Sequence, residues 1–234
     1  MIATLVNAGA VIAGGLLGLL LHGKVKKDKF DNITRALGLC VCIIGIASAI
    51  KGDAMLLIVS LAVGTLFGEL INIDGLLNKF GAFLQSKFSK KDSKENKFAE
   101  GFCAASLLFC VGAMSIVGSI NAGLSQDYSV IFTKSILDGV SAVIFASTFG
   151  VGVLFSAAVI LVYQGAIELF AGVLEPLLSD GLVLQLSAAG GVMILALGIN
   201  MVLNAPDKAA KIKTANMLPG LVIAAVYYLV KGAL

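Results

Sequence analysis

The sequence has little charge and a single histidine. Charged residues make up 13% of the 234 positions and hydrophobic residues 59%, against about 25% and about 45–50% in a soluble domain. This composition excludes a soluble domain of useful size. Apolar runs recur along the chain at about 20 residues, the length that crosses a hydrocarbon core of about 30 Å. The sequence therefore predicts an all-α integral membrane protein whose helices contact the lipid bilayer.

Several chemistries lack the residues they need. His22 is the only histidine and has no neighbouring ligand pattern, so neither a metal site nor a catalytic dyad is predicted. No phosphate-binding glycine loop and no paired nucleophile and base are present, so we expect no enzyme and no cofactor. A basic stripe with interleaved aromatics is also missing, which argues against nucleic acid. The four cysteines lie in apolar runs and are read as small packing residues: Cys40, Cys42, Cys103 and Cys110.

The basic residues are concentrated between the apolar runs. Fourteen of the seventeen Lys and Arg residues lie in the stretches 24–35, 79–97 and 208–213. The positive-inside rule makes these stretches cytoplasmic, which leaves both termini outside after eight crossings. About eight spans, with seven possible, are expected within one membrane domain, 1–234. Their ranges are 2–22, 33–51, 53–73, 98–120, 131–149, 151–174, 182–203 and 214–231.

Two segments outside the spans differ in character. Residues 74–88 alternate apolar and polar side chains at helical spacing, which predicts an amphipathic helix on the inner leaflet. Residues 89–97 are polar and charged, and they are expected to form a solvated cytoplasmic linker.

A weak internal repeat relates two of the spans. Gly38 and Gly45-Ile46 align with Gly191 and Gly198-Ile199. Because the two segments would cross in opposite directions, we expect inverted three-helix repeats flanking a central pair of spans, a construction that recurs in transporters. The alternative is coincidence, since glycine and isoleucine are common in membrane helices.

Ionisable residues inside the spans are the best candidates for a site, since each costs several kcal/mol unless it is paired or hydrated. Asp138 lies near the middle of its span, and Lys134 lies four residues earlier on the same helical face. Gln164 and Glu168 have the same spacing in the next span. The Lys134 and Asp138 pair can neutralise itself, or it can bind a polar solute.

Further polar residues are candidates of lower rank. Glu69 approaches a cytoplasmic interface, and Pro219 follows Asn216 closely enough to loosen its turn. Asn7 is read chiefly as a hydrogen-bonding contact between helices. The remaining candidates to line a polar path are Ser119, Asn121 and Asn200.

Glycine pairs at four-residue spacing predict close helix contacts. Gly14 and Gly18 form one pair, and Gly64 and Gly68 form another. Small residues at this spacing bring helix backbones together. Sequence alone does not separate contacts within one chain from those in a homodimer, and a homodimer stays open.

A long motif run resembles a known family. It starts at Phe109-Cys110-Val111-Gly112-Ala113-Met114-Ser115 and continues through Lys134-Ser135-Ile136-Leu137-Asp138-Gly139 to Tyr163-Gln164-Gly165. With Asn7, Gly68-Glu69 and Asn216-Met217-Leu218-Pro219, it is similar to the bacterial membrane proteins of domain-of-unknown-function family 554, the YdfK/YqgA-like group. Similar proteins usually have proline in place of Ala113, and alanine is common in place of Gly220.

The resemblance covers nearly the full length and implies a multi-spanning protein of the bacterial inner membrane with a role in transport. With the polar residues it favours a small secondary transporter or channel for a small polar or ionic solute, coupled to protons or sodium. The alternative is a membrane scaffold or accessory subunit that acts through its helix-packing surfaces. Neither reading names the solute.

Overall fold

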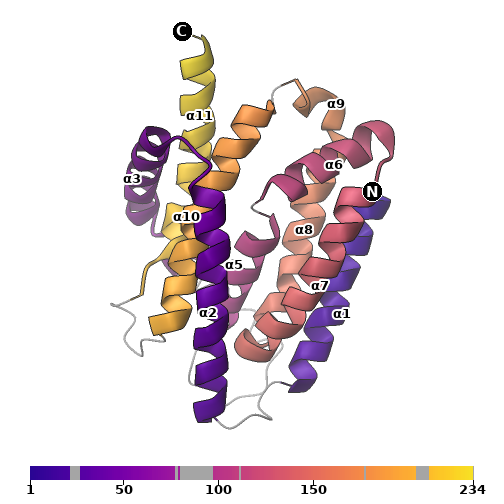
Figure 1. Cartoon of the computed structure of the whole chain (residues 1–234), viewed down its shortest axis with the longest axis vertical. Coiled ribbons are helices and arrows are strands. Elements are labelled where there is room, and N and C mark those ends of the chain that lie inside the picture. Colours follow the sequence, from indigo (N-terminus) through magenta and orange to yellow (C-terminus); the bar gives the residue numbers. More distant parts are fainter. Residues whose placement is uncertain are drawn as a thin grey trace. The chain divides into compact units, whose positions relative to one another are not determined.

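The computed structural model describes residues 1–21, 27–76, 79, 97–110, 112–176, 178–203 and 211–233. Every element in this part of the chain is helical (Figure 1). The chain forms two compact units that interleave in sequence. Unit 1 comprises Met1–Val25 and Asn78–Ser179, and unit 2 comprises Lys26–Leu77 and Asp180–Leu234. The predicted amphipathic helix 74–88 beyond Leu76, the linker 89–96 and His22 lie outside the described residues, apart from position 79.

Within the described ranges, six helices are long and apolar enough to cross a membrane, and a bent pair makes a seventh span if its two helices count as one. The eight predicted spans are thus reduced to six or seven. The segment predicted at 33–51 is the difference, since the apolar part of its helix, Thr34–Ala49, is shorter than the six.

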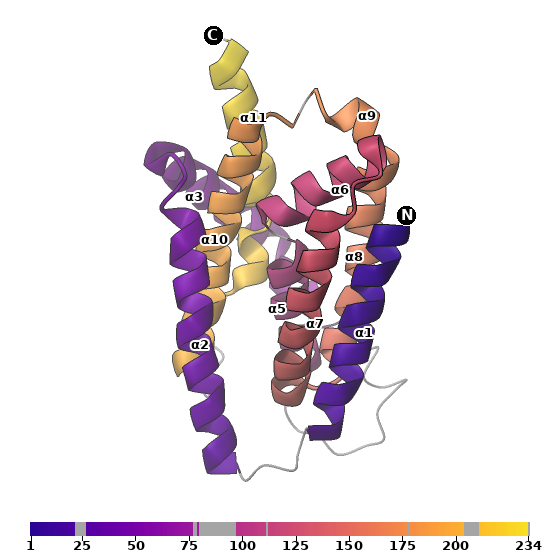
Figure 2. The same ribbon diagram turned by 45° about the vertical axis from the view of Figure 1, so that its right-hand side comes forward.

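Unit 1 contains most of the polar residues of interest. α1 (Ile2–Leu21) runs parallel to α7 (Ser129–Phe149), because Gly14 faces Gly139 and Gly18 faces Val143. Figure 2 shows these two helices side by side. A side chain at Gly14 or Gly18 would collide with the α7 backbone, so the first predicted glycine pair makes a contact within the chain. α8 (Gly152–Leu169) packs on α1 and is followed by the short α9 (Ala171–Leu174).

The expected continuous span 98–120 is wrong. It is divided into α5 (Lys97–Cys110) and α6 (Ala113–Ser125), which meet at an angle of 58°. Gly112 precedes the first turn of α6, and its carbonyl accepts hydrogen bonds from the amides of Ser115 and Ile116. The interruption therefore occurs at a glycine, although Ala113 stands where proline would have signalled a bend.

Unit 2 is built on close backbone contacts. α2 (Lys27–Ala49) packs on α10 (Asp180–Leu203) along glycines. A Cβ on Gly38 would lie 2.9 Å from the Gly198 oxygen, and one on Gly198 would lie 2.8 Å from the Gly38 oxygen. Gly45 and Gly191 oppose each other in the same reciprocal way, at 2.7 and 2.8 Å. The helices are antiparallel and too close for any side chain at these four positions.

The second helix pair of unit 2 is also antiparallel. α3 (Ala54–Ile71) packs on α11 (Pro219–Ala233) with Gly64 against Gly220, and Gly68 lies against Asn216. α11 begins at Pro219, where proline has no amide hydrogen to leave unsatisfied. The 3-10 turn Thr214–Met217 precedes it, so the span predicted at 214–231 begins as a turn. The Asp53 side chain caps α3 by accepting hydrogen bonds from the amides of Met55 and Leu56, at 2.9 and 3.2 Å.

A buried polar centre in unit 1

The centre is organised around an ion pair on α7. Lys134 donates to Oδ2 of Asp138, and each residue is only 6% exposed. The spacing of four residues puts both side chains on one face of the helix. The helix around them is otherwise largely apolar, and a charge in this setting must be paired or hydrated. The two residues predicted as a self-neutralising pair do meet.

Asn7 of α1 connects this pair to α8. It is 0% exposed, and its Nδ2 donates to Asp138 Oδ2 at 3.0 Å and to Gln164 Oε1 at 3.1 Å. Gln164 Nε2 donates in turn to Ser115 Oγ of α6 at 2.9 Å. Side chains from four helices thus form one hydrogen-bonded network. It contains three residues predicted for the site, together with Asn7 and Ser115.

Glu168 extends the polar side of α8 by one turn. Thr4 of α1 donates to Glu168 Oε2 at 2.7 Å, and the α-amino group of Met1 pairs with Oε1. Thr4 and Asn7 are three residues apart and share one face of α1. Gln164 and Glu168 are four residues apart and share one face of α8, and these two faces meet. Glu168 is 6% exposed, and the partner required for a buried carboxylate is present.

Two buried polar atoms of α1 and α6 have no hydrogen-bond partner among the described residues. They are Asn7 Oδ1 and Ser119 Oγ, and both side chains are buried. Ser119 lies one turn after Ser115 on α6, on the same face. Buried polar atoms are nearly always hydrogen-bonded, so these two require an explanation.

The centre lies beside the interrupted helix. Cys110, the last residue of α5, is within electrostatic range of both Lys134 and Asp138. Ser115 belongs to the first turn of α6 and is bonded to Gln164. Helices broken at membrane depth are typical of transporter binding sites, where backbone groups freed at the break face the solute.

The other predicted site residues make hydrogen bonds of their own. In unit 2, Asn200 donates to the Ile212 carbonyl at 2.8 Å and accepts from its amide at 2.9 Å. Asn216 Oδ1 accepts from the Asp74 amide at 2.7 Å, and Glu69 pairs with Lys213 at 2.9 Å on an exposed surface. Asn121 belongs to unit 1, and its carbonyl accepts from Ser125 Oγ near the end of α6. These residues hold helix ends and turns.

Sequence comparison places the chain in a family. The family model described as "Protein of unknown function (DUF554)" matches residues 2–229. The chain belongs to the DUF554 family. It is 36% identical over 228 residues to "Uncharacterized membrane protein YdfK" of Bacillus subtilis (strain 168), covering 95% of this chain and 93% of that protein. It is 30% identical over 227 residues to "Uncharacterized protein YqgA" of Escherichia coli (strain K12), covering 96% and 94%. No solved structure matches.

The DUF554 match confirms the predicted resemblance and extends through both units. This DUF554 chain is an integral membrane protein with several spans, and the Bacillus relative is named a membrane protein.

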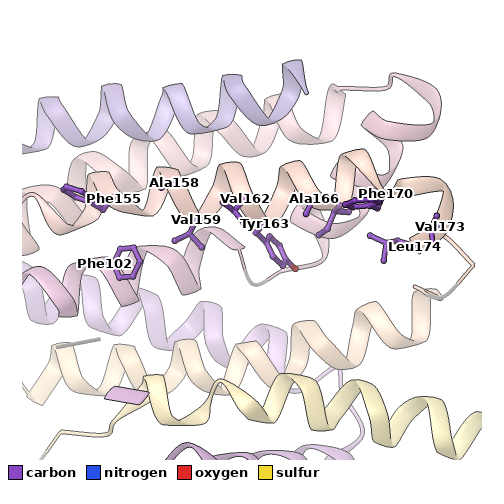
Figure 3. A pocket seen from close by; sticks show the side chains of 11 residues that line it. Phe102, Phe155, Ala158, Val159, Val162, Tyr163, Ala166, Phe170, Val173 and Leu174 are labelled. Atoms are coloured by element: carbon purple, nitrogen blue, oxygen red, sulfur yellow. The ribbon is translucent and has the colours of Figure 1, made fainter. Parts of the chain in front are cut away.

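Another face of α8 carries an apolar groove (Figure 3). Its lining comes from α5, α8, α9 and the residue between the last two, and includes Phe102, Phe155, Tyr163 and Phe170. In this DUF554 protein, Tyr163 of the groove and Gln164 of the polar centre are consecutive, so one helix separates an apolar surface from a polar interior.

Sequence analysis did not predict Thr4, Asn7 and Ser115 as members of the polar centre. Thr4 and Asn7 share a face of the first helix, and that spacing was the available signal. Nothing in the sequence indicated Ser115, because its role depends on the break at Gly112 and on which helix faces it.

Proposed function

We propose that this protein is a small secondary transporter or channel for a small polar or ionic solute, with Asp138 at the binding position. The observation that carries the proposal is the buried Lys134–Asp138 pair, which is hydrogen-bonded to Asn7, whose Oδ1 has no partner, in a network that reaches a broken helix. A protein that needed only to fold would gain nothing from ionised groups at this depth. Gln164, Glu168 and Ser119 complete the polar lining, and the chain carries out no catalysis.

The proposed topology and the inverted repeat both fit an alternating-access mechanism. We include α2 as a span, so that eight crossings leave both termini outside a bacterial inner membrane and the basic stretches inside. The reciprocal contacts favour the inverted repeat, because Gly38 opposes Gly198 while the repeat aligns Gly38 with Gly191. An in-plane twofold axis between α2 and α10 requires this exchange of partners. Reporter fusions at residue 92 and at the C-terminus test the topology, and equal reporter activity at both would contradict it.

Water access tests the transport proposal. In a chain whose native cysteines are replaced, Asp138→Cys should react with a charged methanethiosulfonate reagent from the aqueous phase. Ala142→Cys is the matched control, because Ala142 lies one turn further along α7 and is 0% exposed in a packed contact. Reaction at 138 but not at 142 supports a hydrated site. Equal resistance at both positions would overturn the proposal.

The second candidate is a scaffold or accessory subunit, monomeric or dimeric. The observation that favours it is the pairing itself, since Asp138 and Glu168 both have cationic partners and need no solute. Asp138→Asn lowers stability under either reading, because it removes the partner of Lys134. Only in a transporter does the same variant also lose solute-induced thermal stabilisation in a screen of ions, amino acids and organic acids.

A further inference from the structure

The side chain of Asn7 has only one orientation that satisfies its neighbours. Its amide nitrogen serves two acceptors, Asp138 Oδ2 and Gln164 Oε1. A carboxylate oxygen and an amide oxygen cannot donate, so exchanging the two ends of the Asn7 amide would break both bonds. The unpartnered atom is therefore the amide oxygen, a pure acceptor, in a side chain that is 0% exposed.

The same region supplies further oxygen atoms. Lys134 and Asn7 both bind Asp138 through Oδ2, so neither of these bonds uses the second carboxylate oxygen. Ser119 Oγ has no partner among the described residues. Acceptors left without donors, next to a carboxylate, are the ligands that hard cations take.

Lys134 already provides a positive charge at this carboxylate. Its ammonium group is a compact charge on a flexible four-carbon stem. It can leave Asp138 by rotating side-chain bonds, with α7 unchanged. A cation that enters would neutralise the carboxylate in place of Lys134. The displaced ammonium must then be hydrated or find another acceptor, since an unpaired charge at this position is costly.

The charge of the donor set selects a monovalent ion. Asp138 provides one negative charge, and Asn7 provides a neutral oxygen. Glu168 is already engaged by Thr4 and the Met1 amino group. Among the described residues, no group of three or more His, Cys, Asp or Glu side chains could hold a metal ion. Divalent sites usually collect several carboxylates.

We propose that Asp138 and the Asn7 amide oxygen bind an alkali-metal cation of the sodium class, and that the Lys134 ammonium is the tethered occupant it displaces. This inference rests on the proposed function and names the ion class of the same site. A tethered competitor acts at an effective concentration of about millimolar or more. Removing it should therefore strengthen sodium binding markedly.

The test measures the melting temperature of the purified full-length protein as NaCl replaces choline chloride at constant ionic strength. The wild type should be stabilised with a half-saturating sodium concentration that falls at least tenfold in Lys134→Met. Asp138→Asn should show no sodium response. Lys213→Met is the matched control, since Lys213 forms an exposed pair with Glu69 in unit 2, and its sodium response should equal that of the wild type.

Lys134→Arg keeps the test decisive if Lys134→Met does not fold. Arginine remains charged and forms a bidentate ion pair with a carboxylate, so the half-saturating sodium concentration should rise about tenfold. Equal half-saturation in the wild type and in the variants that fold, or no sodium response in any protein, would overturn the inference. The cysteine reaction at position 138 uses no sodium, so the proposed hydrated site would stand or fall separately.

Discussion

The two units of the molecule hold their helices together by different means. Unit 1 places a network of charged and amide side chains between α1, α6, α7 and α8. Unit 2 brings backbones together at glycines, and among its described residues the ion pairs are exposed and near helix ends. Among the residues that the structure describes in unit 2, no buried charged side chain joins the helices. Because small residues alone can join helices in a membrane, the buried charges of unit 1 need a reason other than folding.

The largest expected effect breaks the ion pair of unit 1. Asp138→Leu leaves the Lys134 ammonium buried without a partner, which should cost about 3–5 kcal/mol of unfolding free energy. The double variant Lys134→Met with Asp138→Leu should recover most of this loss, since packed apolar residues replace a buried pair well. Equilibrium unfolding in mixed micelles measures both. A double variant as unstable as the single one would mean that the pair is needed for folding, and the contrast with unit 2 would disappear.

The next effect concerns the glycine contact of unit 2. In Gly45→Ala the new Cβ would lie 2.5 Å from the Leu195 nitrogen and 2.7 Å from the Gly191 oxygen, so the helices must separate. Overpacking of this kind costs about 1–3 kcal/mol. Gly9→Ala is the control, because nothing lies within 4 Å of its added methyl. Thermal unfolding should show a loss at position 45 and none at position 9; equal values would deny the close packing.

A smaller effect probes the hydrogen bonds of unit 1 away from the ion pair. Thr4→Val keeps the side-chain shape and removes the donor to Glu168, which should cost about 0.5–2 kcal/mol. Thr133→Val removes only a bond to the Ser129 carbonyl on an exposed face and should change stability little. The same unfolding assay compares them, and a reversed order would count against the network.

The smallest effect is a pH dependence at the end of unit 2. The Lys231 side chain, followed by the Leu56 and Met55 amides, lowers the pKa of Asp53. A pKa that is lower in the folded protein adds stability above the unfolded value of about 3.9, and this stability disappears as pH falls through the folded value. The melting temperature of the wild type should exceed that of Asp53→Asn at pH 6 and converge with it in acid. A gap that widened in acid would contradict the sign.

The helical periodicity of the sequence predicted part of the centre. Lys134 with Asp138, and Gln164 with Glu168, are pairs within one helix, so their shared faces followed from spacing alone. Asn200, Asn216 and Glu69 were ranked as candidates from their polarity alone, because spacing does not say which helices meet. They lie in unit 2, where they hold turns and helix ends. Asn7 was assigned only a packing role for the same reason.

The apolar runs of the sequence predicted where the helices lie, but they did not predict where helices are interrupted. The break between α5 and α6 falls at Gly112, a residue also common inside continuous membrane helices, and the position where proline would have signalled a break holds Ala113. The turn before Pro219 was expected to be the regular start of the span 214–231, although the 3-10 turn Thr214–Met217 precedes the helix. Hydropathy measures burial in lipid and carries no information on backbone hydrogen bonds at a break.

The interleaved order of the units has a consequence for biosynthesis. Helix α2 ends at Ala49, but its glycine partner α10 begins only at Asp180, after most of unit 1 has been made. At bacterial synthesis rates of about 5–20 residues per second, α2 and α3 wait on the order of ten seconds for their partners. During that interval the narrow glycine face of α2 is covered by lipid or by the insertion machinery. Assembly of unit 2 is therefore a late event in the membrane, completed after the last helix has left the ribosome.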